Sequence, residues 1–104
     1  MTALACVYAV FADADEAERI ARSMIDEGLA GCVNILGACR SIYRWDGAIE
    51  TAVEIPALFK TVPAHAEALA ARIAELHSYD VPAISHWQAG TTAPYARWLA
   101  DATR

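Results

Sequence analysis

The hydrophobic pattern of the first part of the chain predicts a strand followed by an amphipathic helix. Residues 4–11 form a short run of apolar, β-branched and aromatic side chains, which is typical of a buried strand. Over residues 15–27, apolar side chains recur at helical spacing and charged side chains take the other face. Asp13 and Glu16 match a capping box at the start of this helix, and Gly28 suits its end. We therefore expect the helix to lie against a sheet.

The middle of the chain predicts a strand in two pieces that leads into a hairpin. The pieces are residues 31–36 and 39–45, separated by a glycine that favours a bend. The Asp46-Gly47 pair then favours a tight two-residue turn, because glycine tolerates the positive φ that such a turn requires. Alternation places Tyr43 and Trp45 on the same face of the strand. This aromatic surface has to be buried under the chain itself or under another subunit.

Three more elements follow the turn. Residues 48–61 predict a long third strand, in which Pro56 lacks an N–H and has to face an edge or a bulge. Pro63 suits the first turn of a second helix, which we expect to end near His77. Residues 83–88 then predict a fourth strand.

The order of the elements predicts an α+β, ferredoxin-like sandwich. It is β-α-β-β-α-β with an antiparallel sheet, and a C-terminal helix capped by Thr92 follows. We expect a single domain over residues 1–104, with both crossover helices on one face of the sheet. The other face is left to the last helix and to other subunits of a trimer.

Composition narrows the classes of partner. Hydrophobic residues make up 57% of the 104 residues, a large share for a small domain, and this favours an oligomer. The net charge of −5 and the scattered basic residues argue against nucleic acid and against an anionic membrane. The start of the chain lacks a charged secretory leader, so we expect a cytoplasmic protein. Each of the three cysteines lies in an apolar run and is expected to pack as a small hydrophobe.

The three histidines are the candidate metal ligands. His77 is expected at a helix C-terminus, either as a ligand or as a cap on the last carbonyls of that helix. His86, in the fourth strand, is expected to be packed or at an interface, with a role as second ligand as the alternative. His65 is expected to be exposed. No pair has the spacing of a metal motif, so a copper(II) site of imidazoles and carboxylates would have to form across the fold or between subunits.

A second group of residues suggests a ligand cleft. Lys60, Tyr79 and Tyr43 would line a cleft for an acidic small molecule. Alternatively, the aromatic side chains form trimer contacts, with Trp45 and Tyr43 at the interface, and Lys60 pairs with a carboxylate such as Glu54. Ser-His-Asp sets, nucleophile elbows and glycine-rich phosphate loops are missing from the sequence, which predicts a protein that is not an enzyme.

The chain resembles the CutA family of trimeric divalent-cation tolerance proteins in six segments, which occur in the same order. They are residues 12–17 (ADADEA), 28–36 (GLAGCVNIL), 40–47 (RSIYRWDG), 60–61 (KT), 76–82 (LHSYDVP) and 95–99 (YARWL). The resemblance implies a ferredoxin-like protomer, a tight trimer, an architecture related to that of the PII signalling proteins, and an association with copper and other divalent metals. Three positions depart from the family pattern. Phe11 stands where some members have a copper-associated cysteine, Ser78 replaces the usual proline, and Pro56 interrupts the third strand.

Two functional hypotheses follow. The first is a cytoplasmic homotrimer that binds divalent metal, copper(II) above all, through His77 with His86 as a possible second ligand, and that acts in metal tolerance. The alternative is a PII-like sensor or assembly module that binds a small ligand in the cleft between subunits, with metal incidental.

Overall fold

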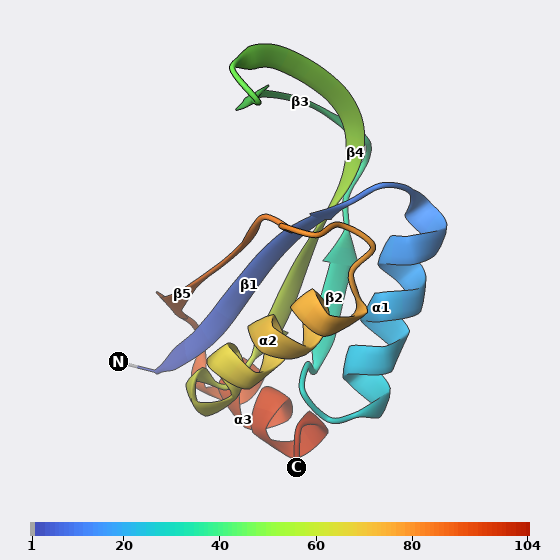
Figure 1. Cartoon of the computed structure of the whole chain (residues 1–104). Coiled ribbons are helices and arrows are strands. Elements are labelled where there is room, and N and C mark those ends of the chain that lie inside the picture. Colours follow the sequence, from blue (N-terminus) through green and yellow to red (C-terminus); the bar gives the residue numbers. More distant parts are fainter. Residues whose placement is uncertain (1) are drawn as a thin grey trace.

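The computed structural model describes residues 2–104 and contains one sheet with helices on both faces (Figure 1). Its strands are β1 (Ala3–Phe11), β2 (Cys32–Ile35), β3 (Cys39–Trp45), β4 (Ala48–Thr61) and β5 (Ile84–Gly90). Its helices are α1 (Ala14–Asp26), the 3-10 turn η1 (Pro63–His65), α2 (Ala66–Leu76) and α3 (Ala93–Ala102). Within residues 2–104, none of the helices combines the length and hydrophobicity needed to cross a membrane.

The sheet has the predicted antiparallel, ferredoxin-like arrangement. The strand order is β2-β4-β1-β5, and β3 pairs with the first half of β4, beyond β2. Pro56 lies between these two ladders, because β3 pairs with β4 as far as Glu54 and β2 begins its pairing at Ala57. The missing N–H therefore falls where β4 changes partners, as the sequence required.

The two faces of the sheet are covered by different helices. Val7 and Phe11 of β1 and Phe59 of β4 are fully buried beneath α1 and α2. The alternate residues of β1 point to the opposite face, where Leu4 and Cys6 pack against Leu99 of α3. The predicted placement of the crossover helices and of the last helix is thus confirmed.

Local sequence signals account for the helix start and the hairpin. The Asp13 side chain accepts a hydrogen bond from the Glu16 N–H at 2.8 Å, and Gly28 ends the helix with a φ of 73°. Asp46 and Gly47 have φ values of 48° and 80°, and positive φ at both central residues is the signature of a type I′ turn.

The β3–β4 hairpin extends from the body as a curved ribbon, which we call the arm (Figure 1). Both of its faces carry exposed apolar side chains: Ile42, Ile49 and Val53 are each about two-thirds exposed on one face, and Trp45 is 54% exposed on the other. The chain's own elements therefore leave these side chains of the arm exposed.

Candidate functional site

His77 lies immediately after α2, and its ring is buried against β1. The Nε2–H donates to the carbonyl oxygen of Val10 at 2.8 Å, and Nδ1 accepts from the Tyr79 N–H at 3.1 Å. The ring stacks on Phe11, with centroids 4.9 Å apart. Both ring nitrogens are therefore engaged in hydrogen bonds, with the roles of donor and acceptor assigned from the Tyr79 N–H. The alternative that the ring caps its own helix is wrong, because it bonds to a strand carbonyl instead.

Glu16 lies beside His77 and is buried. It accepts hydrogen bonds from the Ser78 N–H at 2.8 Å, from the Ser78 hydroxyl at 3.0 Å and from the Ala12 N–H at 3.3 Å. Burial acts to raise the pKa of Glu16, but the hydrogen bonds from Ser78 and Ala12, with His77 nearby, lower the pKa below its usual value overall. A proline at position 78 would supply neither donor, so Ser78 strengthens this contact.

Tyr79 connects these residues to the base of the arm. Its hydroxyl donates to Glu54 Oε2 at 2.9 Å, and its ring centroid lies 4.7 Å from that of His77. Burial, followed by the bond to Glu54, raises the pKa of Tyr79 to about 12. We call Glu16, His77, Ser78, Tyr79 and Glu54 the polar network, in which Ser78 is exposed, Tyr79 is half-buried and the other three are buried. It ties α1, β1, the loop after α2 and β4 together.

A Tyr79→Phe variant is expected to lose about 1–3 kcal/mol of unfolding free energy, because Glu54 is only 7% exposed and loses its donor. Urea unfolding at neutral pH measures the change. Tyr8→Phe is the control, because the Tyr8 side chain is 37% exposed and water can solvate its hydroxyl; its effect should stay within about 0.5 kcal/mol. Equal losses in both variants would contradict the role of the Glu54 contact.

The predicted cleft residues separate into two places. Tyr43 is near enough to Tyr79 to influence its pKa. Lys60 is six residues along β4 from Glu54, about 20 Å at the rise of an extended strand, and its Nζ lies 5.9 Å from the centre of the Tyr95 ring. Within one chain, Lys60 therefore lies far from Tyr79 and Tyr43 and does not line a cleft with them. The expected partner Glu54 bonds to Tyr79 instead.

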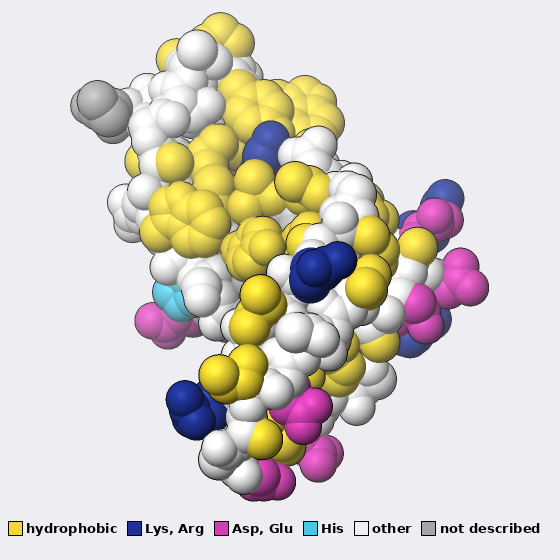
Figure 2. All heavy atoms as spheres, turned by 90° about the horizontal axis from the view of Figure 1, so that it is seen from above, with side chains coloured by type: hydrophobic (Ala, Val, Ile, Leu, Met, Phe, Trp, Pro, Cys, Tyr) yellow, Lys and Arg dark blue, Asp and Glu magenta, His cyan; other side chains and the backbone are white. Residues whose placement is uncertain are grey.

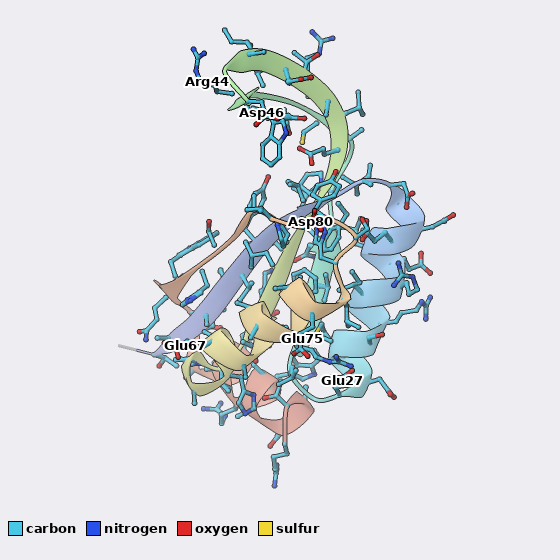
Figure 3. The ribbon with its side chains drawn as sticks, in the orientation of Figure 1. Glu27, Arg44, Asp46, Glu67, Glu75 and Asp80 are labelled. Atoms are coloured by element: carbon cyan, nitrogen blue, oxygen red, sulfur yellow. The ribbon has the colours of Figure 1, made fainter. Side chains whose placement is uncertain are left out.

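His86 is exposed on β5, opposite Val7 of β1. It lines a hollow of about 400 Å³ between β5 and the start of α2, together with Trp87, Gln88 and Glu67. Figure 3 shows Glu67 at this end of α2 and Glu75 at the other end. His65 is half-buried, contrary to the expectation that it is exposed.

The structure adds two acidic residues that the sequence analysis did not place in a site. Glu16 was expected only as a helix cap, and no local signal relates Glu67 to His86. The partners are far apart in sequence, by 62 residues for Glu16 and Ser78. Within residues 2–104, no three His, Cys, Asp or Glu side chains come close enough together to hold a metal ion.

Comparison with known proteins gives consistent matches along the chain. A family model described as CutA1 divalent ion tolerance protein matches residues 5–102. The divalent-cation tolerance protein CutA of Pyrococcus horikoshii is 38% identical over 99 residues, which cover 94% of this chain and 96% of that protein. The rice protein CutA 1, chloroplastic, is 34% identical over 99 residues, 94% of this chain and 56% of that protein. A structure titled as the periplasmic divalent cation tolerance protein CutA of Archaeoglobus fulgidus superposes with a TM-score of 0.93 at 27% identity, covering 97% of this chain and 99% of that one.

The fold and these matches define a small ferredoxin-like protein of divalent-cation tolerance, with a hairpin arm and a C-terminal helix. The chain belongs to the CutA1 divalent ion tolerance family. The predicted family and fold are confirmed.

Proposed function

We propose that this protein is a homotrimer that serves divalent-cation tolerance by binding copper(II), and that it acts by binding and not by catalysis. Family membership supports the connection with divalent cations. The observation that carries the metal proposal is the hollow in which an exposed imidazole, His86, and a carboxylate, Glu67, face the same space. Copper(II) favours imidazole nitrogen together with carboxylate oxygen.

His86 is the better candidate for the first ligand, although His77 was expected in that role. His77 would have to break hydrogen bonds at both ring nitrogens and leave its stack on Phe11 before it could bind a metal. His86 is exposed and has Glu67 across the hollow. Two protein ligands leave coordination positions open, and water or a neighbouring subunit would fill them.

The trimer is supported by the apolar surface that the chain leaves exposed. Figure 2 shows apolar side chains spread over much of one face, with few charged side chains between them. Large apolar side chains that are about half exposed include Trp87 and Trp98 as well as those of the arm. Apolar patches of this extent mark protein interfaces, and we assign Trp45 and Tyr43 of the arm to this interface.

Copper(II) titration of the metal-free protein by calorimetry tests the site. We expect His86→Ala and Glu67→Gln each to weaken copper binding about tenfold or more, because each variant removes a proposed ligand. A factor of ten corresponds to only 1.4 kcal/mol of binding free energy. Glu75→Gln is the matched control: it removes a carboxylate from the same helix, away from the hollow, and should leave the affinity unchanged (Figure 3).

A folded His77→Gln variant separates the two histidines. Binding that survives this change and is lost in His86→Ala supports the site proposed here. The reverse result would assign copper to His77 and the polar network around it. Binding that no variant alters would make copper incidental.

Cytoplasmic location is also part of the proposal. Cys6, Cys32 and Cys39 are free thiols in the structure, which suits a reducing compartment. The rice protein is named as chloroplastic and the Archaeoglobus fulgidus protein as periplasmic, so location varies among proteins similar to this one.

A further inference from the structure

Lys60 is the only lysine in the chain, and it lies between two of the three cysteines. It is directly opposite Cys6 on β1 and directly opposite Cys32 on β2. Residues opposite each other on antiparallel strands point to the same face and have Cβ atoms about 4.5–5.5 Å apart. A single amine therefore has a thiol within reach on either side.

The surroundings of Lys60 keep these groups together. Cys6 packs against Leu4 and Leu99 on the face covered by α3, and only 7% of its surface is exposed. The Lys60 Nζ lies 5.9 Å from the centre of the Tyr95 ring, and Cys32 is close enough to affect the pKa of the Tyr95 hydroxyl. Cys32 and Lys60 are half-buried, so a small oxidant can reach them.

Two familiar roles for paired cysteines do not fit this geometry. Cys6 and Cys32 are on strands that flank β4, so their backbones are about 10 Å apart at the spacing of neighbouring strands. A disulfide requires Cα atoms within about 7 Å. A metal site does not fit either, because within residues 2–104 no three His, Cys, Asp or Glu side chains come close enough together to hold an ion. What remains within reach of each thiol is the amine between them.

We propose that Lys60 and Cys32 form a reversible nitrogen–oxygen–sulfur bridge under oxidising conditions, with Cys6 as a second site on the other side. Dioxygen is the oxidant. One of its oxygen atoms forms an N–O bond to Nζ and an S–O bond to Sγ, while one N–H bond and the S–H bond break. The other oxygen leaves as water with these two hydrogens. Nitrogen and sulfur each lose two electrons, and dioxygen accepts all four.

The bridge acts as a covalent link between β2 and β4. β2 has only four residues and lies at the edge of the sheet, where β4 is its one partner strand within residues 2–104. A link from Cys32 to Lys60 fixes the end of β2 that follows the α1–β2 connection. Reduction by excess thiol restores both side chains: four thiols become two disulfides, and the bridging oxygen leaves as water. The link therefore reports the redox state of its surroundings.

Mass spectrometry tests the bridge on the folded, full-length protein. The reduced protein is exposed to dioxygen-saturated buffer, and its free thiols are then alkylated under denaturing conditions. We expect a species that gains one oxygen atom, loses two hydrogens and has one alkylation site fewer. Digestion should yield a peptide pair joining Cys32 to Lys60, and dithiothreitol should abolish it.

Variants distinguish the bridge from ordinary cysteine oxidation. Lys60→Arg and Lys60→Gln should both lose the species completely, and Cys32→Ser should reduce it at least tenfold, whereas Cys39→Ser should retain it. Circular dichroism confirms that each variant is folded. The proposal is overturned if oxidation yields only sulfinic acids or intermolecular disulfides, or if the same mass change persists without Lys60.

Discussion

Replacing Trp45 with alanine is expected to dissociate the trimer. The indole is 54% exposed on the arm of the isolated chain, and the trimer proposed here buries it. Truncating a buried tryptophan costs about 3–5 kcal/mol, which corresponds to roughly a thousandfold weaker association per subunit. Sedimentation equilibrium at micromolar concentration measures this directly. The wild type should have three times the chain mass of 11.2 kDa, and the variant should approach the mass of one chain.

Arg44→Ala is the matched control for this experiment. Arg44 is next to Trp45 on β3 but points to the opposite face, and it lies near the tip of the arm (Figure 3). Its side chain donates to the Gly47 carbonyl oxygen within the exposed turn, so its loss should leave the trimer intact. Monomeric wild-type protein at micromolar concentration would refute the trimer. Equal dissociation of both variants would show that Trp45 has no particular role.

Glu16→Gln is expected to produce the largest loss of stability within one chain. The variant should lose about 2–3 kcal/mol of unfolding free energy at pH 7, because its amide cannot accept all three hydrogen bonds from Ser78 and Ala12. Urea unfolding measures the loss. Glu18→Gln is the control on the same helix. Its ion pair with Arg22 is exposed, and its removal should cost less than about 0.5 kcal/mol.

The cost of Glu16→Gln should depend on pH in a defined direction. The folded-state pKa of Glu16 is lowered, so its contribution is complete above the unfolded value of about 4.3 and disappears as pH falls through the folded value. The stability difference between wild type and variant should therefore shrink in acid. A difference that stays constant from pH 7 to below pH 4 would mean that the charge on Glu16 is not what stabilises the fold.

Much of the fold could be predicted because its signals are local. The N-cap at Asp13, the stop at Gly28 and the turn at Asp46-Gly47 each involve neighbours in sequence and were found where expected, although the Glu16 side chain bonds to Ala12 and not to Asp13. Residues 4–11 were predicted as a buried strand, and β1 is buried under α1 and α2 on one face and under α3 on the other. Ile25, expected on the buried stripe of α1, is 42% exposed because it lies at the edge of that stripe.

The candidate sites could be predicted only in part, because their partners are distant in sequence. His77 was expected either to bind metal or to cap its own helix, yet its ring bonds to Val10, 67 residues away. Lys60 and Tyr79 were expected to line one cleft. In the structure Tyr79 bonds to Glu54, six residues along β4 from Lys60, and Lys60 lies near Tyr95 instead. Periodicity assigns a residue to a face of an element. It does not give the register in which that element meets another.

The sequence by itself determined the order of the elements, the antiparallel sheet and the family. These depend on hydrophobic period, turn chemistry and motif order, all of which can be read along one chain. Only the tertiary structure decided that both nitrogens of His77 are occupied, that His86 and Glu67 share a hollow, and that the single lysine lies between two thiols. The physical reason is that strand register and helix docking, which no local signal specifies, determine which side chains meet.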